Sequence, residues 1–411
     1  MNKPVAVPEP GRICVVNGAP QKSFLFHLLH RRMPEGWSVV GYEEGQNLDV
    51  DRIVFLWLAP DFHALRPDVA FNRGEAHITN AVPMDVRQRL ARGDAWLLID
   101  ATNEAPAVGY LACDHLGETL DQWGVPRERV MYLSSNHQLP HASSRFGMQA
   151  HVVDFFAIQL ALQLGTELRT AHESLARTWP RRSWTQPMLC LNETPRAHRV
   201  ALIACLLADG LMSSHFVSWG GWDHGKAKDL AASAREGAES LLADAPEALR
   251  HLDAAMRLPR VTFESTSATG NELAFSFPTT LYASSSFSLV SESSINAEVT
   301  RLSEKSVKAL CGGHFPLIWG TAHSRPLIEK YGFDAVKDDL VWSFDNEEDA
   351  PRRLKLVRET YRGIIDRTIF RPEDNVETLM WNMDFGRERL YDHLWIVMID
   401  SLFTRLAGTA P

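Results

Sequence analysis

The chain has 411 residues, of which 45% are hydrophobic, and its formal net charge at pH 7 is −9. This length exceeds the usual size of one domain, so two domains are expected. A net negative charge excludes broad electrostatic coating of nucleic acid, which needs a basic face, although it leaves room for a local basic pocket. No run of about 18 uncharged apolar residues occurs, so the sequence predicts no membrane span.

The cysteines and the N-terminus indicate a compartment. The five cysteines are scattered, and no two of them form a CxxC pair. They stand mostly within apolar strand or helix patterns, which predicts buried, reduced thiols in a cytosolic protein. The first residues, MNKPVAVPEPGR, lack the apolar core of a secretory signal peptide, so a cytoplasmic location is expected.

The first half of the chain alternates short apolar runs with helical patterns. Strands are predicted at 12–16, 38–41, 52–58, 95–100 and 129–134, and helices at 22–31, 84–91, 117–123 and 152–164. Such alternation is typical of a parallel sheet with helices on both faces. Because ligands of these sheets bind beyond the carboxyl ends of the strands, Glu104, shortly after the fourth strand, is a candidate site residue.

A polar, basic segment at 174–186 separates the two halves, and we place the domain boundary between residues 180 and 181. The second half restarts the alternation, with strands predicted at 188–192, 216–219, 280–290 and 315–320. Helices are predicted at 196–209, at two places within 226–256, at 304–310 and at 325–331. The stretch 350–406 is expected to be mostly helical, with a break at Arg371-Pro372.

Lys305 is the most unusual residue of the second half, because the positive end of a helix macrodipole disfavours a cation in the first turn. Ser303 is a good N-cap, Leu302 and Val307 have the spacing of a hydrophobic staple, and Gly312 follows the helix as a C-cap would. These signals put Lys305 at the second helical position. An anion bound at the helix start would explain the cation there.

A second junction between a strand and a helix repeats this pattern. Thr194 can cap the next helix and Pro195 suits its first position. Arg196, His198 and Arg199 then crowd its opening turns. Two helix starts thus carry cations where the dipole disfavours them, and a phosphate or diphosphate held between them would account for both.

Two carboxylates are candidates for chemistry on a ligand. Glu104 could remove a proton from an attacking hydroxyl. Glu292 follows an apolar strand and could accept hydrogen bonds from sugar or ribose hydroxyls. Each feature also has a structural interpretation. Glu104 would then be a cap or loop carboxylate, Glu292 would pair with Lys305 or Arg301, and Glu304 with Lys308 would be an ordinary surface pair.

Other motifs give weaker signals. The segment from Gly220 to Lys226, GGWDHGK, nearly matches a P-loop, but Ala227 replaces the serine or threonine that would bind magnesium. A glycine-rich turn beside a ligand cleft fits it better, and a P-loop-like kinase or NTPase is the alternative. No GxGxxG follows the first strand, and neither HExxH nor GxSxG occurs. His137 and His141 have a proline between them, and no metal is predicted.

The segment from Glu292 through Ser303-Glu304-Lys305 to the strand at 315–318 resembles the donor-binding motif of the α1,3-fucosyltransferase type of glycosyltransferase. In that motif a strand ends in glutamate, a Thr-Glu-Lys helix start follows, and a Gly-x-x-Pro-hydrophobic strand closes the unit. The segment NETPRAHR (192–199) is similar to an N-x-x-P-R-x-H-R segment of related bacterial and viral proteins, with Glu193 where arginine is common.

This resemblance covers residues 186–366 and implies an α/β fold with two Rossmann-like domains that face a central cleft, a GT-B-like arrangement. Domain 1–180 would bind the acceptor and domain 181–411 the donor. It implies a metal-independent glycosyltransferase that uses a nucleotide sugar as co-substrate and needs no other cofactor, with inversion as the expected outcome and retention left open. The acceptor stays open among glycan, lipid-linked glycan, protein and modified nucleic acid. A non-catalytic nucleotide-sugar-binding module is a further alternative.

The resemblance also implies roles for single residues. Glu104 and Glu292 would be the catalytic carboxylates, Glu104 as the base and Glu292 on the donor sugar or ribose. The donor and its phosphates would be held by Asn192, Arg196, His198, Arg199, Ser303, Glu304 and Lys305. Fixed cations and helix N-termini would stabilise the departing nucleoside diphosphate without a metal. Trp219, Trp222 and Phe287 could stack on a base or sugar.

Overall fold

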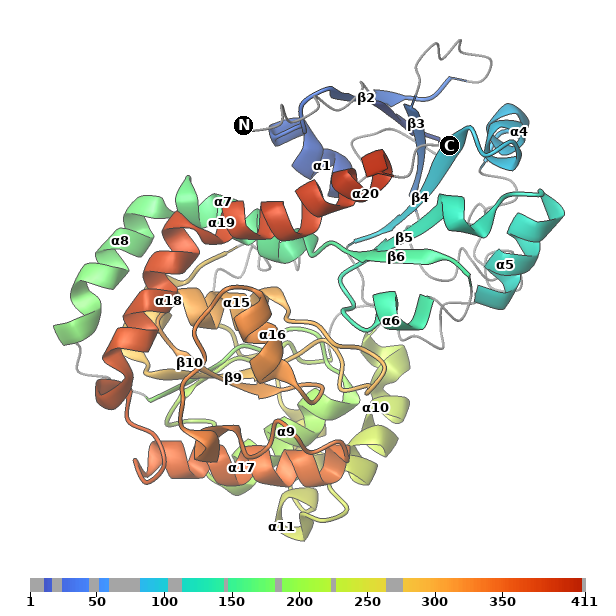
Figure 1. The fold of residues 1–411 in the computed structure, drawn as a ribbon. Coiled ribbons are helices and arrows are strands. Elements are labelled where there is room, and N and C mark those ends of the chain that lie inside the picture. Colours follow the sequence, from blue (N-terminus) through green and yellow to red (C-terminus); the bar gives the residue numbers. More distant parts are fainter. Residues whose placement is uncertain are drawn as a thin grey trace. The chain divides into compact units, whose positions relative to one another are not determined.

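The computed structural model describes residues 11–16, 24–43, 52–58, 82–102, 113–143, 147–181, 187–222, 227–263 and 276–408 (Figure 1). The chain divides into two compact units. The first unit consists of Met1–Phe155 together with Leu394–Pro411, and the second consists of Phe156–His393.

The first unit is built on a six-stranded parallel sheet with the order β2-β1-β3-β4-β5-β6. Its strands are β1 (Gly11–Val15), β2 (Trp37–Gly41), β3 (Arg52–Leu58), β4 (Ala95–Ala101), β5 (Val130–Ser134) and β6 (Gln149–Val152). Its helices are α1 (Phe24–Arg31), α4 (Met84–Ala91), α5 (Cys113–Gln122), η4 (Arg127–Arg129), α6 (Leu139–Ser143), the π-helical turn η9 (Trp395–Asp400) and α20 (Ser401–Gly408). Five of the six strands were predicted; β6, with the short sequence QAHV, carries no clear strand pattern.

The core of the first unit lies on both faces of this sheet. Strands β4 and β5 are buried along their whole length, as expected for parallel strands that helices cover on both sides. The C-terminal segment packs here as well. The Trp37 ring lies 4.9 Å from the Phe403 ring, edge to face, and His151 Nε2 lies 2.6 Å from the Met398 carbonyl oxygen.

The second unit is built on a four-stranded parallel sheet with the order β10-β9-β7-β8. Its strands are β7 (Met188–Cys190), β8 (Phe216–Val217), β9 (Phe287–Ser291) and β10 (Phe315–Trp319). Its helices are α7 (Phe155–Gly165), α8 (Arg169–Thr178), η6 (Trp179–Arg181), α9 (Ala197–Ala208), α10 (Ala227–Leu241), α11 (Pro246–Leu249), α12 (Leu252–Arg257), α14 (Thr279–Ser284), α15 (Glu304–Cys311), α16 (Ser324–Lys330), η7 (Asp339–Trp342), α17 (Ala350–Ile365), η8 (Pro372–Asn375), α18 (Val376–Glu388) and α19 (Leu390–Leu394). In Figure 1, α15 lies on one face of the sheet and α17 on the other.

Both sheets follow one winding rule. In each, the second strand along the chain pairs on one side of the first strand, and the third pairs on its other side. The direction of winding therefore reverses between β1 and β3 in the first sheet and between β7 and β9 in the second. The predicted α/β class, with parallel sheets of the Rossmann-like kind, is confirmed, and the reversal points are where such sheets bind ligands.

The division between the units falls earlier than the boundary expected at residues 180 and 181. Helix α8 precedes that boundary, yet it packs against α14 and α18. Trp179 Nε1 donates a hydrogen bond to the Gly313 carbonyl at 3.1 Å, and His172 Nε2 lies 2.6 Å from the Cys311 carbonyl oxygen. These partners are distant in sequence, so the polar segment at 174–186 gave no sign of them.

Residues 279–284 form helix α14, so the strand predicted at 280–290 is wrong in its first half. Threonine and tyrosine there favour a strand by propensity. Pro278 instead occupies the N-cap position, and its carbonyl accepts the N–H groups of Leu281 and Tyr282 at 3.0 and 3.2 Å. The strand begins only at Phe287, which is fully buried.

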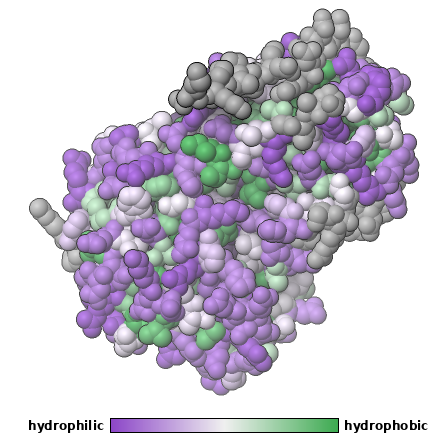
Figure 2. Space-filling view, in the orientation of Figure 1, coloured by the Kyte–Doolittle hydropathy of each residue, from purple (hydrophilic) through white to green (hydrophobic). Residues whose placement is uncertain are grey.

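On the face shown in Figure 2, hydrophilic side chains cover most of the second unit. None of the helices in the described part of the chain has both the length and the apolar composition needed to cross a membrane. The cysteines whose side chains are described, Cys14, Cys190, Cys205 and Cys311, are free and buried.

Candidate functional site

Helix α15 begins as the sequence predicts. Ser303 is its N-cap, and the Ser303 hydroxyl accepts the Lys305 N–H at 3.3 Å. Lys305 is therefore the second helical residue, next to Glu304. The helix ends at Cys311 with Gly312 as its C-cap, and Gly313 adopts a φ of 71°, which suits glycine in this position. The cation thus lies in the first turn, where the backbone N–H groups are exposed.

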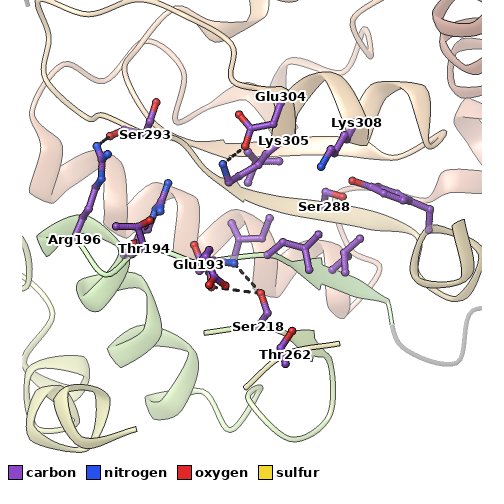
Figure 3. A pocket seen from close by; sticks show the side chains of 17 residues that line it. Glu193, Thr194, Arg196, Ser218, Thr262, Ser288, Ser293, Glu304, Lys305 and Lys308 are labelled. Atoms are coloured by element: carbon purple, nitrogen blue, oxygen red, sulfur yellow. Dashed lines mark hydrogen bonds and ion pairs between the residues drawn. The ribbon is translucent and has the colours of Figure 1, made fainter. Parts of the chain in front are cut away.

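Helix α9 begins later than expected. Arg196 is its N-cap residue, with the Arg199 and Val200 N–H groups both donating to the Arg196 carbonyl at 2.9 Å, so Thr194 does not cap it. The Arg196 guanidinium donates to the carbonyl of Ser293, which follows β9 (Figure 3). Arg196 therefore links the start of α9 to the carboxyl end of a neighbouring strand.

A cavity of about 210 Å³ lies between these two helix starts. Its wall is formed by β7 and the loop after it, the start of α9, β9, and the first turns of α15, together with Ser218, Thr262 and Tyr282 (Figure 3). Thr194, Arg196 and Ser293 line it beyond the carboxyl ends of β7 and β9, where the winding of the sheet reverses, and it continues along β9 as far as Ser288. The cavity therefore occupies the place where doubly wound sheets bind ligands.

The cavity wall is positively charged. Arg196, Arg199, Lys305 and Lys308 line it, against the two carboxylates Glu193 and Glu304, which gives a net charge of +2. The Glu193 carboxylate also forms an ion pair at 3.0 Å with Arg260, which does not line the cavity. The two cations that the sequence singled out, Arg196 and Lys305, share this one cavity.

Glu304 and Lys305 form an ion pair within the wall (Figure 3). The Glu304 side chain is only 12% exposed. Burial alone would raise its pKa, but the charges of Lys305 and Lys308 and the hydrogen bond from Lys305 lower the pKa to about 2. Glu304 is therefore ionised at neutral pH and holds the Lys305 ammonium at the cavity.

Arg199 and Asn192 line the cavity while being almost completely buried, at 3% and 1% exposed. Arg199 donates to the carbonyls of Thr194 and Glu292 at 2.9 and 3.2 Å. Burial, followed by the charge of Arg196, lowers the pKa of Arg199 to about 10. Arg199 Nε and Asn192 Oδ1 lack hydrogen-bond partners among the described residues. Each such atom costs about 1–3 kcal/mol unless water or a ligand satisfies it, and both of these residues line the cavity.

Glu292 does not line the cavity. Its buried carboxylate accepts the Ser303 N–H at 2.9 Å and the Ser306 hydroxyl at 2.6 Å. It therefore provides the negative charge that the start of α15 favours. The structural interpretation fits, although its partner is the helix start and not Lys305 or Arg301. The contact predicted between this carboxylate and a sugar has no support in its position.

His198 and Ser303, both expected to hold the donor, are buried supports behind the wall. His198 Nε2 lies 2.8 Å from the Glu292 carbonyl oxygen, and Trp319 Nε1 donates to the His198 carbonyl at 2.9 Å. Burial, with the charge of Arg199 as the next cause, lowers the pKa of His198 to about 3, so the imidazole is neutral. These contacts fix α9 and α15 to the strand ends.

Not every residue singled out from the sequence is described. Glu104 lies outside the described residues, and so does Lys226. Gly220 is required for packing, because a Cβ there would lie 1.5 Å from the Glu193 carbonyl oxygen. The predicted stacking aromatics Trp219 and Phe287 are fully buried and do not line the cavity.

Lys308, Tyr282 and Ser288 are among the lining residues that were not predicted from the sequence. Lys308 could have been predicted from the sequence. Residues three apart lie on the same face of a helix, so Lys308 faces the same way as Lys305. Tyr282 could not have been predicted in this way, since the segment that contains it was assigned to a strand.

Comparison with family models, curated proteins and solved structures found no match to this chain. Within the described residues, no three histidine, cysteine, aspartate or glutamate side chains are grouped as metal ligands would be. A bound ligand is therefore indicated by the charge, burial and position of the cavity itself.

Proposed function

We propose that this protein is a metal-independent glycosyltransferase, and that the cavity of the second unit binds the diphosphate of a nucleotide-sugar donor. One observation carries the proposal: Arg196, Arg199 and Lys305 converge from two helix starts on one cavity at the reversal point of a parallel sheet. Helix N-termini with adjacent cations are suited to phosphate groups.

The charges of the cavity suit the chemistry of sugar transfer. When the bond between the sugar and the phosphate breaks, negative charge develops on the departing nucleoside diphosphate. Cations that are already fixed in place stabilise this charge without reorganising during the reaction. Arg199 is fixed by two carbonyl hydrogen bonds, and Lys305 is fixed by Glu304.

The cavity volume limits what it can hold. Ligand pockets usually span roughly 300–1,000 Å³, and this cavity measures about 210 Å³. We therefore assign to it the nucleoside diphosphate of the donor rather than the whole nucleotide sugar. In the proposed GT-B-like arrangement the first unit binds the acceptor, and Glu104 acts as the base that deprotonates the acceptor hydroxyl.

Ligand-induced thermal stabilisation tests the donor site. A panel of nucleoside diphosphates and nucleotide sugars is added to the intact chain, and the melting temperature is followed. A ligand at a hundred times its Kd should stabilise the folded protein by about 2.7 kcal/mol. Lys305→Ala should weaken binding by roughly tenfold to a hundredfold, because it removes a charge-assisted hydrogen bond and leaves the Glu304 carboxylate facing the phosphates.

Lys337→Ala is the matched control, since Lys337 is exposed and lies outside the cavity. Stabilisation that persists unchanged in Lys305→Ala would place the ligand elsewhere and refute the assignment. Release of nucleoside diphosphate in the presence of acceptors then separates an enzyme from a binding module. Stabilisation by magnesium and ATP alone would favour the kinase or NTPase alternative.

A further inference from the structure

The cavity has two chemically different ends. Arg196 is at the exposed end, and Lys308 and Ser288 are at the opposite end (Figure 3). Lys308 and Ser288 are both only 4% exposed. The buried Tyr282 and the leucines Leu189 and Leu289 also line the cavity. The buried end is therefore mostly apolar and has few polar groups.

His314 determines how Ser288 can form hydrogen bonds. His314 Nε2 lies 3.1 Å from the Tyr282 carbonyl oxygen, and His314 Nδ1 lies 2.9 Å from the Ser288 hydroxyl. A carbonyl only accepts, so Nε2 carries the hydrogen. The imidazole is fully buried, which favours its neutral form. Nδ1 then accepts, and the Ser288 hydroxyl donates its hydrogen to Nδ1.

This arrangement leaves Ser288 able only to accept from a ligand, while the Lys308 ammonium can only donate. A phosphate at the buried end would face the Ser288 lone pairs, and of these two side chains only Lys308 could donate to it. A neutral, flat group that carries both a donor and an acceptor satisfies both side chains. Apolar walls with a few placed polar groups are the usual plan of a small-molecule site.

The geometry points to one orientation of the ligand: the edge of a nucleobase lies at the Ser288 and Lys308 end, with the phosphates at the Arg196 and Lys305 end. This inference rests on the proposed donor site. Ser288 and Lys308 then read the hydrogen-bonding pattern of the base. His314 is a positioning residue, which acts by keeping Ser288 an acceptor.

Titration calorimetry with Ser288→Ala tests the orientation. The probes are the tightest-binding nucleoside diphosphate of the panel and inorganic pyrophosphate. Loss of one hydrogen bond should weaken nucleoside diphosphate binding about three- to tenfold and leave pyrophosphate binding unchanged. Lys305→Ala should weaken the binding of both. Ser285→Ala is the matched control, because this buried hydroxyl donates to the Leu281 carbonyl at 2.6 Å and does not line the cavity.

His314→Leu supplies a second readout. With Nδ1 gone, the Ser288 hydroxyl can turn and donate to the ligand, so the ratio of affinities for ADP, CDP, GDP and UDP should change. A purely structural role would lower the melting temperature and leave that ratio as it was. That result would overturn the role of His314.

Two further outcomes separate the inference from the proposed function. Equal weakening of pyrophosphate and nucleotide by Ser288→Ala would put a phosphate at the buried end and overturn the orientation. The orientation also fails if Ser288→Ala leaves nucleotide affinity unchanged while Lys305→Ala lowers it, although the donor site would stand. If no nucleoside diphosphate stabilises the protein, both fail together.

Discussion

Replacing Glu304 by glutamine should destabilise the second unit in a way that depends on pH. The substitution keeps the size of the side chain and removes its charge. Glu304 is 12% exposed and forms an ion pair with Lys305. Burial opposes its ionisation, but Lys305 and Lys308 more than offset burial, and the pKa falls from 4.5 to about 2. The ionised form is therefore stabilised by folding.

The size of the effect follows from this pKa. Each pKa unit corresponds to about 1.4 kcal/mol, so the shift contributes about 3 kcal/mol of stability at neutral pH. Because the pKa of the folded state is lower than that of the unfolded state, this stability is present above about pH 4.5 and is lost as the pH falls toward 2. Less than half of it should remain at about pH 3.

Urea unfolding of the wild type and Glu304→Gln between about pH 7 and pH 3 measures this difference. Glu377→Gln is the matched control, since Glu377 is an exposed carboxylate in the first turn of α18. The control should change stability by about 0.3–1 kcal/mol. If the difference in unfolding free energy between Glu304→Gln and the wild type stays constant over this pH range, the lysines do not lower the pKa of Glu304.

Two further substitutions test how the site is supported. Gly220→Ala should lower stability by about 1–3 kcal/mol, because the new Cβ would lie 1.5 Å from the Glu193 carbonyl oxygen. Thermal unfolding measures this loss. Gly165→Ala is the control and should cost much less, because its Cβ would make only an ordinary contact at 3.5 Å. Glu292→Gln should lower stability by roughly 1.5–3 kcal/mol through the weakened start of α15. If Glu292→Gln instead abolished sugar transfer at unchanged stability and unchanged nucleotide affinity, its catalytic role would be restored.

The sequence by itself determined the features that depend on neighbouring residues. Apolar runs between helical patterns gave the parallel strands and the α/β class. The Ser303 cap and the glycines after Cys311 fixed α15 within one residue of its predicted end, because caps act on N–H and C=O groups only a few residues away. The same local logic identified Lys305 and Arg196 as cations at helix starts.

Only the tertiary structure decided what these residues face. Arg196 reaches the carbonyl of Ser293, 97 residues later in the chain, and the buried Ser288 and His314 meet across neighbouring strands. The sequence likewise did not predict that the Glu292 carboxylate accepts hydrogen bonds from the start of α15, or that α8 belongs to the second unit. Local patterns record interactions within a few residues, whereas a cavity is formed by segments that fold together from distant parts of the chain, so its lining could not be predicted from any one of them.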